Sequence, residues 1–584
     1  MRKGIFYTTA LSITILLVSV AFADFILPGG DVSLDLFNPE ISTNWLKDTF
    51  KLDPSHKDLI NFSDPSYVYF EWLPNYSFST SSSESTSGTL LSYNTEGVNE
   101  LLKSKVTVRL RLNDKSFVKL YFFYDKMDPY GKSKMDIDGN GKLDEVETVS
   151  YNVSYYGWWP YRNSLDAQAF LALDLNAIKL QVGAGYERWY SPYDLKIITY
   201  DDGTKKYELE NAFSIWWISD AKSYGNDRLD SSFKLYGNVY VSGLNVWAKG
   251  LYFEKGTVKI GHYIIVDDKK EPKEQCKYDD ADCKDQWDYM KIRGTAGIDL
   301  NMGGIVVSPE LYVYKYNSNY ELYYRKDKND ESSKNSEGDS LRLKPLVSVY
   351  IPGLEIKATA YYDRYRWNYI SWGNDSSGEI VTSGASEIAY EEGKYSWDEA
   401  SLDIAKKLSV YGLDTLANLS LFYNSESGRG AAYDKDKKEI KGNDVEYNWQ
   451  YYWRPYDKMN VGITASTWFA KKFFNDKVAI GTSMKGSLTW ESYKEYEYDD
   501  ASGKVKVENQ RSYIEWSFNP FSKLYAELKA LDGLWIRISG SINGDFATDN
   551  PDQWLNGDYV SSSPTIDKNS NVGVNLTLSV KYIF

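Results

Sequence analysis

The chain has 584 residues, with 67 Lys and Arg against 82 Asp and Glu, which gives a formal net charge of −15 at pH 7. This acidic balance excludes nucleic acid as a partner, because no basic patch could offset repulsion from phosphate. Mean hydropathy is −0.50. Beyond the N-terminus no run of about 18 apolar residues occurs, so no transmembrane helix is predicted.

Residues 1–23 predict a cleaved signal peptide. Arg2 and Lys3 form a basic start, Ile5 to Val20 is an apolar core, and Ala21-Phe22-Ala23 supplies an A-x-A cleavage site. We therefore expect an exported chain.

Residues 24–65 predict an N-terminal periplasmic segment. The segment lacks long alternation and contains Pro28, Pro39 and Pro54. A short helix is expected around Thr43 to Lys51, with Thr43 as its N-cap. This segment is too short to be the large plug of an energy-coupled outer-membrane receptor.

From residue 66 onward, apolar and polar residues alternate with a period of two, which predicts antiparallel strands with one apolar face. Examples are Val106–Leu112, Ile178–Glu187, Val461–Phe469 and Leu534–Ile542. Tight turns are expected at Asn113-Asp114, Asn176-Ala177, Ser242-Gly243, Gly303-Gly304, Pro352-Gly353, Gly412 and Asp532-Gly533. Long polar loops are expected at 125–147, 267–289, 317–340, 367–396, 424–444, 491–507 and 545–570.

Residues 136–147 resemble the twelve-residue calcium loop of EF-hand proteins. Gly141 at position 6 permits the sharp turn, and Leu143 supplies the usual apolar residue. The flanks depart from a helix-loop-helix hand, so the resemblance implies a structural Ca²⁺ site that orders an external loop; an ordinary solvated Asp/Gly loop is the alternative. The expected metal ligands are Asp136, Asp138, Asn140, Lys142 through its backbone carbonyl, Asp144 and Glu147.

Cys276 and Cys283 are the two cysteines of the chain and lie within one hydrophilic stretch. In an exported chain such a close pair predicts a local disulfide. Free thiols are the alternative. His56 and His262 are the only histidines, and no nucleophile elbow, zinc spacing or phosphate loop is present, so we expect no enzyme. The alternative is a glycosidase-type pair among the many Asp and Glu residues of the loops, which are otherwise expected to be solvated surface residues.

The final residues, Val574 to Phe584, place apolar side chains at every second position and end on an aromatic residue. This ending resembles the C-terminal assembly signal of bacterial outer-membrane β-barrels, with Phe584, Tyr582, Val580, Leu578 and Leu576 at the matching positions. The 51 Tyr and 19 Trp agree with aromatic girdles at two membrane interfaces. An ordinary terminal strand of a Tyr-rich soluble β-protein is the alternative.

The resemblance and the alternation together predict an all-β fold, a transmembrane antiparallel up-and-down β-barrel over residues 66–584. We expect 18–24 strands, with 20–22 as the best estimate, short periplasmic turns and long extracellular loops. The closing partner of the last strand is expected at Tyr67 to Trp72. Side chains expected to line a water-filled lumen are Lys105, Arg109, Arg111, Lys179, Glu187 and Arg537.

A large barrel with a charged interior predicts a porin-type outer-membrane channel for passive diffusion of small hydrophilic solutes or ions. The resemblance implies outer-membrane lipid and the barrel-assembly machinery as partners and suggests a homotrimer. Two alternatives remain: a structural or adhesive envelope barrel with calcium-ordered loops, and a secreted carbohydrate-binding β-protein.

Overall fold

The computed structural model describes residues 52–583 with gaps, the longest of which are 136–143, 149–162, 211–222, 374–381, 441–455 and 562–572. The expected signal peptide and the helix around Thr43 to Lys51 lie outside the described residues. Among the described residues, no helix has the length and apolar character needed to cross a membrane.

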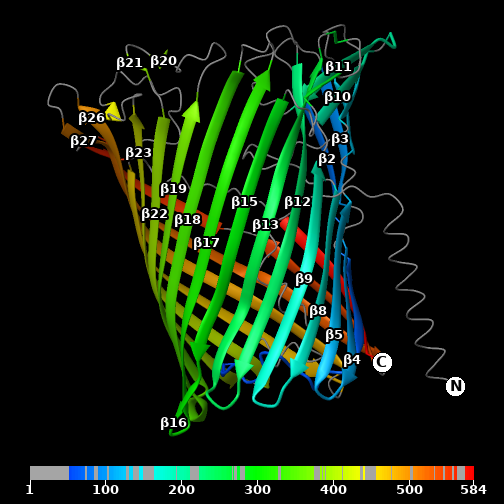
Figure 1. Cartoon of the computed structure of the whole chain (residues 1–584), viewed down its shortest axis with the longest axis vertical. Coiled ribbons are helices and arrows are strands. Elements are labelled where there is room, and N and C mark those ends of the chain that lie inside the picture. The colour runs from blue at the N-terminus through cyan, green and yellow to red at the C-terminus, as the bar shows by residue number, and fades with distance from the viewer. Residues whose placement is uncertain are drawn as a thin grey trace.

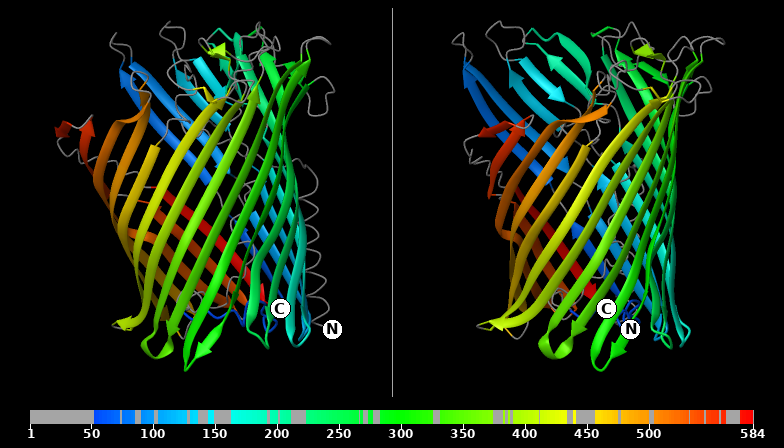
Figure 2. Two further views of the ribbon diagram at one scale, coloured as in Figure 1. Left: turned by 60° about the vertical axis from the view of Figure 1, so that its left-hand side comes forward. Right: turned by 90° about the vertical axis from the view of Figure 1, so that its left-hand side faces the viewer.

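Eighteen antiparallel strands form a closed barrel in which each strand pairs with its neighbours along the chain (Figures 1 and 2). The ring closes where the first strand pairs with the last, Tyr67 opposite Ile583 and Trp72 opposite Leu578. The barrel strands are β1 (Tyr67–Trp72), β4 (Ser104–Asn113), β5 (Ser116–Lys126), β8 (Asn163–Asp174), β9 (Ile178–Ser191), β12 (Ser223–Val241), β13 (Val246–Ile265), β15 (Cys283–Ile298), β17 (Ile305–Arg325), β18 (Glu331–Ile351), β19 (Ile356–Gly373), β22 (Tyr390–Val410), β23 (Leu413–Tyr433), β25 (Tyr456–Phe473), β26 (Val478–Asp499), β27 (Lys504–Leu531), β28 (Leu534–Asn543) and β31 (Gly573–Ile583).

The expected fold class, an antiparallel up-and-down barrel, is confirmed. The strand number lies within the expected range and below its best estimate. One reason is that Glu254 to Gly256 and Asn519 to Phe521, either of which could have been a turn, lie inside the continuous strands β13 and β27. Near Asn519 the ladder between β26 and β27 shifts register, so an irregularity in the strand accounts for the Pro-containing sequence.

Tight turns join strands at one end of the barrel, here called the short-turn end. All the expected tight turns fall between paired strands there, including Gly303 and Gly304, whose φ angles of 64° and 91° favour glycine. Pro352–Leu354 forms a short 3-10 helix between β18 and β19. The opposite end, here called the loop end, carries the long connections (Figure 1).

The long polar connections contain more strand than expected. Three neighbouring hairpins at the loop end pair side by side in a second, six-stranded sheet made of β2 (Asn75–Glu84), β3 (Leu90–Glu100), β6 (Tyr130–Met135), β7 (Asp144–Thr148), β10 (Asp194–Thr199) and β11 (Lys205–Glu210). Asn317 to Arg325, placed in a loop by its polarity, continues β17 and pairs with β18. Polar composition therefore marks where the strands leave the apolar belt, and does not mark where they end.

The remaining strands have two to ten residues and are not among the eighteen of the ring. They are β14 (Lys273–Cys276), β16 (Leu300–Met302), β20 (Thr382–Ser383), β21 (Ser386–Glu387), β24 (Glu439–Ile440), β29 (Phe546–Leu555) and β30 (Asp558–Ser561).

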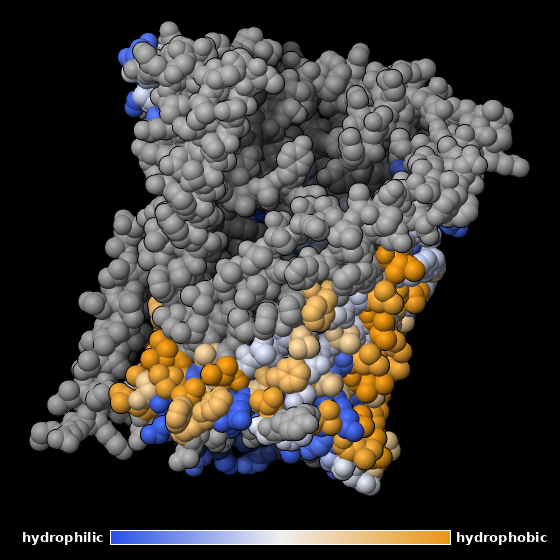
Figure 3. Space-filling view, turned by 180° about the vertical axis from the view of Figure 1, so that it is seen from behind, coloured by the Kyte–Doolittle hydropathy of each residue, from blue (hydrophilic) through white to orange (hydrophobic). Residues whose placement is uncertain are grey.

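An apolar belt surrounds the outside of the barrel. Along β18 the outward positions are apolar from Leu341 to Ile351 and become acidic at Asp339 and Glu337. At a strand tilt of about 40° this run covers roughly 25 Å along the barrel axis, close to the apolar band of membrane barrels. Figure 3 shows hydrophobic residues gathered on the outer wall towards the short-turn end, with hydrophilic residues along the rim below them.

Residues 52–64, here called the N-terminal strap, precede β1 and lie at the short-turn end (deep blue in Figure 1). Leu52 packs against Leu416, Ala470 and Ala479 of β23, β25 and β26. Further along the strap, Ile60 packs in a separate cluster with residues of β5 and β8. The strap is thus enclosed by the barrel wall.

Candidate functional site: the inner wall of the barrel

Alternate residues of each strand face the interior of the barrel, and these inward positions form the candidate functional site. On β9, Gln181 and Glu187 are 8 % and 6 % exposed, whereas Val182 and Tyr186 are 44 % and 48 % exposed on the outer face. The alternation in the sequence therefore assigns the two faces of this strand correctly.

The residues expected to line the lumen all occupy inward positions of the ladder, but their surroundings differ. Lys105 faces Glu71 across the β1–β4 pair, with Nζ 3.7 Å from the carboxylate. Arg111 lies by the turn and donates to Asp114 at 2.6 Å. Arg537 pairs through its backbone with Glu527 and with Ser579, and its side chain lies outside the described residues.

Two of the expected lumen residues contact the strap. Arg109 is fully buried, donates to the carbonyl oxygen of Asn61, and reaches Asp64 Oδ2 at 3.5 Å. The guanidinium carbon of Arg109 also lies 3.8 Å from the ring centre of Phe117. Lys179 donates to the carbonyl oxygen of Lys57 at 3.3 Å. Both cations therefore hold a segment of the chain inside the mouth.

Glu187 belongs to a buried ion cluster that sequence reasoning missed. Lys234 of β12 is fully buried between Asp166 of β8, at 3.0 Å, and Glu187 of β9. Aromatic side chains of a buried cluster line the same wall: Tyr121, Phe170, Tyr236 and Tyr252. Asp166 and Lys234 have the right alternation for inward positions, but their meeting depends on the register of three strands, which the sequence does not reveal.

A second buried carboxylate, Glu254 of β13, continues this network. Glu254 accepts from Tyr252 at 2.8 Å and from Tyr289 at 3.0 Å, and Lys291 of β15 lies 3.4 Å away. The inner wall from β8 to β15 is thus held together by charge-assisted hydrogen bonds.

The wall from β17 to β22 carries aromatic rings with cations over them. Arg342 donates two hydrogen bonds to Asp363, at 2.9 and 2.7 Å, and Lys344 lies 3.5 Å from the same carboxylate. Lys344 Nζ is also 3.5 Å from the ring centre of Tyr361. Arg342 lies 5.3 Å from the ring of Trp397. Two cations, Arg342 and Lys344, thus share the carboxylate of Asp363 and lie over aromatic rings on this part of the wall.

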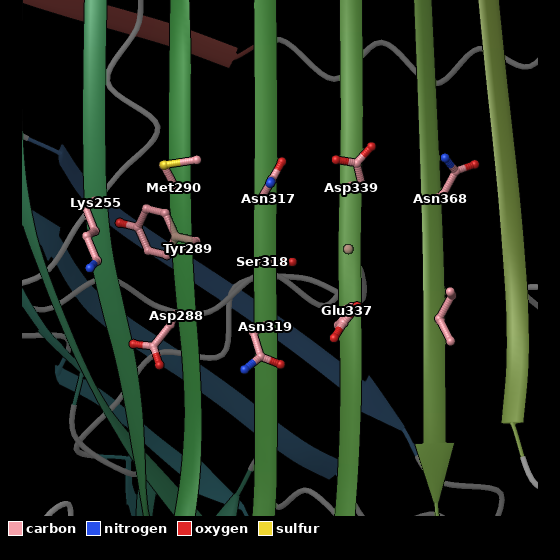
Figure 4. A pocket seen from close by; sticks show the side chains of 12 residues that line it. Lys255, Asp288, Tyr289, Met290, Asn317, Ser318, Asn319, Glu337, Asp339 and Asn368 are labelled. Carbon is pink, nitrogen blue, oxygen red and sulfur yellow. The ribbon is translucent and has the colours of Figure 1, made fainter.

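A cavity of about 580 Å³ lies on the other side of the wall (Figure 4). Its lining includes Lys255 and Asp288, which belong to the outward set on β13 and β15, and it spreads to β19 just beyond the apolar belt. Asp339, one of the lining residues, also forms an ion pair with the outward Lys315. This cavity opens away from the lumen and is not part of a route through the barrel.

The expected calcium loop is mostly undescribed. Residues 136–143 lie outside the described residues, and Asp144 and Glu147 lie on strand β7. The strand thus begins at position 9 of the expected loop. Within the described part of the chain no group of His, Cys, Asp or Glu side chains is arranged to hold a metal ion. Calcium binding stays a prediction.

Cys276 ends β14 and Cys283 begins β15, and both of these strands pair with β13. Their side chains lie outside the described residues, so the disulfide also stays a prediction. His262, on the inner face of β13, bonds to Asp285 at 3.0 Å. His56 lies in the strap.

Comparisons with known proteins give the following results. No family model and no curated protein matches the chain. Among solved structures, it is similar to the outer membrane transporter YddB from Escherichia coli, at 10 % identity and a TM-score of 0.34, over 89 % of this chain and 81 % of that one. It is also similar to the ferripyoverdine receptor of Pseudomonas aeruginosa, at 11 % identity and a TM-score of 0.33, over 89 % and 72 %. Likenesses of this size say nothing about the function of this chain.

Proposed function

We propose that this chain is an outer-membrane channel through which small hydrophilic solutes diffuse passively. The observation that carries the proposal is the two-faced wall: a closed ring of eighteen strands that is apolar outside and charged inside. Membrane barrels of about 16 to 18 strands are wide enough to enclose an aqueous channel.

The placement in the membrane follows from the same wall. The outer belt supplies the apolar surface that lipid requires, and membrane barrels place short turns in the periplasm and long connections outside the cell. We therefore assign the short-turn end, with the strap, to the periplasm and the six-stranded sheet to the outside.

The pairing of inner charges supports weak ion selectivity. Lys105 faces Glu71 and Lys458 lies 2.7 Å from Glu491. Because each of these cations has a carboxylate beside it, these two parts of the wall present both signs of charge side by side. We expect a permeability ratio for potassium over chloride near unity, and passage of uncharged hydrophilic solutes.

Reconstitution in planar lipid bilayers tests the proposal. Folded protein should give stable steps of current that are proportional to voltage, and vesicles containing it should swell in small sugars at a rate that falls with sugar size. Heat-unfolded protein from the same preparation is the control. Absence of current and swelling from protein that is folded would reject the channel and favour a structural envelope barrel.

A further inference from the structure

The first residues of the N-terminal strap reach across the periplasmic mouth, and those from His56 to Asp64 follow the wall from β15 and β13 to β9 and β4. Leu52 packs on β23, β25 and β26, whereas Ile60 and Phe62 pack against Phe117 of β5 and Ala172 of β8. These two groups of strands are about half a turn apart in the ring order. A chain of eight to ten residues can reach about 30 Å, which is enough to cross.

A clasp holds the middle of the strap. The backbone N–H of His56 donates to Asp299 Oδ2 at 2.6 Å, and its ring Nδ1 lies 3.1 Å from Oδ1. Trp247 Nε1 and Ser308 Oγ donate to the same carboxylate oxygen, at 2.9 and 2.8 Å. Asp299 is thus satisfied by donors from the strap and from the barrel wall together.

The ring of His56 is fixed on its other edge as well. Lys249 Nζ lies 2.8 Å from Nε2, and because an ammonium group can only donate, Nε2 accepts and Nδ1 carries the proton. The imidazole also stacks on Trp247, with ring centres 3.6 Å apart. Lys249 in turn donates to Glu310 of β17 at 3.1 Å.

A β-bulge aims the clasp residues inward. The ladder between β13 and β15 shifts register between Lys249 and Tyr252, around Gly250, which has a φ of 60°. Without the shift, Lys249 and Tyr252 would face opposite sides of the wall. With it, both Lys249 and Tyr252 face the interior.

The strap has no strand pairing among the described residues. β1 begins at Tyr67, and residues 52–64 are held by side-chain contacts and by cations that donate to strap carbonyls, as Arg109 does to Asn61. Undocking the strap would therefore break no ladder hydrogen bond of the barrel. Water can replace the polar partners at the clasp.

We propose that the N-terminal strap is a resident gate at the periplasmic mouth, held closed by the clasp between His56 and Asp299. Docked, it narrows the mouth and limits current; undocked, it leaves the barrel intact and the mouth wider. This inference rests on the proposed channel function.

His56→Ala removes the imidazole from the clasp, with its contacts to Asp299, Lys249 and Trp247, and keeps the backbone N–H. Asp299→Asn weakens the acceptor on the barrel side. Both variants should raise single-channel conductance severalfold over the parent, or add a larger conductance state. Leu343→Ala is the control, because Leu343 lies on the outer face of β18, where it is 37 % exposed, and does not face the lumen. It should leave conductance unchanged.

Chemical labelling follows the strap directly. In a background with both native cysteines changed to Ser, Ile60→Cys places a thiol at a position that is 2 % exposed. A maleimide reagent should label it slowly, and at least tenfold faster when His56→Ala is added, with heat-modifiable migration confirming that the barrel is folded.

The outcomes separate the two proposals. Equal labelling with and without His56→Ala overturns the clasp. Faster labelling with unchanged conductance overturns the gate while leaving the channel. Absence of current from parent and variants alike overturns the proposed function itself, and the gate with it.

Discussion

The two halves of the inner wall use the same alternating strands in different ways. From β4 to β13, ions of both signs are buried: Arg109 and Lys234 are 0 % exposed and Asp166 is 1 % exposed. From β17 to β26 the carboxylates of Asp363 and Glu491 are buried, but the cations paired with them are not. Asp363 is 0 % exposed, whereas the side chain of its partner Arg342 is 38 % exposed.

The difference follows from what covers each half. Arg109 lies under the strap, and the cluster around Lys234 lies among the aromatic rings of β5, β8, β12 and β13. The cations of the second half reach water. A buried charge must be paired to be tolerated, whereas a wet pair contributes little to stability. The buried charges of the first half therefore concern folding, and the water-exposed cations of the second half concern the lumen.

Lys234→Met should give the largest effect. Removing this cation leaves Asp166 and Glu187 buried without it, which we expect to lower the free energy of unfolding by about 3–5 kcal/mol. Urea unfolding in lipid vesicles measures the change. The triple variant Lys234→Met with Asp166→Asn and Glu187→Gln should recover most of the loss, because no unpaired charge remains. A loss of unfolding free energy below about 1 kcal/mol would contradict the idea that ions of the first half are buried and needed for stability.

Leu235→Arg tests the outer face at the next position of the same strand. Leu235 is 43 % exposed and faces outward. A cation in the lipid-facing belt should destabilise the barrel by about 2–4 kcal/mol in vesicles. The same substitution at Leu244, which is 68 % exposed in the turn after β12, should cost much less. Equal losses at both sites would contradict the position of the belt.

Asp299 makes the clasp sensitive to acid. Burial works to raise the pKa of its carboxyl, but hydrogen bonds from His56 and Ser308 outweigh burial, so the pKa lies below its ordinary 3.8. The carboxylate therefore stabilises the clasp at higher pH, and that contribution is lost as pH falls through the lowered pKa.

The other charged groups at the clasp are Lys249 and Glu310, with Lys357 of β19 nearby. We expect the Asp299 contribution to keep conductance steady between about pH 8 and 5 and to fail below about pH 4, where conductance rises. Asp299→Asn should already show the higher conductance at neutral pH and should lose this acid step. A step that persists in Asp299→Asn would assign it to another group.

Lys344→Ala should have the smallest effect on the free energy of unfolding, because Lys344 belongs to the half of the wall whose cations reach water. The side chain is 25 % exposed and its partner Asp363 keeps its two bonds from Arg342. We expect a loss of about 0–1 kcal/mol in unfolding free energy. Single-channel measurement should instead detect a shift in ion preference towards cations, since one inner cation is gone. A stability loss as large as that of Lys234→Met would show that Lys344 acts like the buried ions of the first half.

Much of the barrel is readable from the sequence because its signals are local. Alternation assigns inward and outward positions on β9, turn residues mark the short-turn end, and Tyr67 to Trp72 is confirmed as the partner of the last strand. Strand ends were not readable, because polar residues such as Asn317 continue a strand once it leaves the apolar belt.

The clasp could not be predicted from the sequence. His56 and Asp299 are 243 residues apart, and their meeting depends on the register of β13 and on the bulge at Gly250. Arg109 and Lys179 have the alternation of lumen residues, and nothing in their spacing indicates a strap. Trp247 contacts both Asp299 and His56, but this is visible only in the folded structure and leaves no signal in the sequence.

The seam between β1 and β31 has a consequence for how the barrel folds. Every other neighbouring pair in the ring is also near in sequence and can form hairpin by hairpin, whereas the seam joins the two ends of the barrel across a ladder of only six residues on β1. Loop-closure entropy therefore concentrates in this one step, and we expect it to limit the folding rate. Because the strap leads directly into β1, the pairing of β1 with β31 also brings the strap to the short-turn end of the barrel.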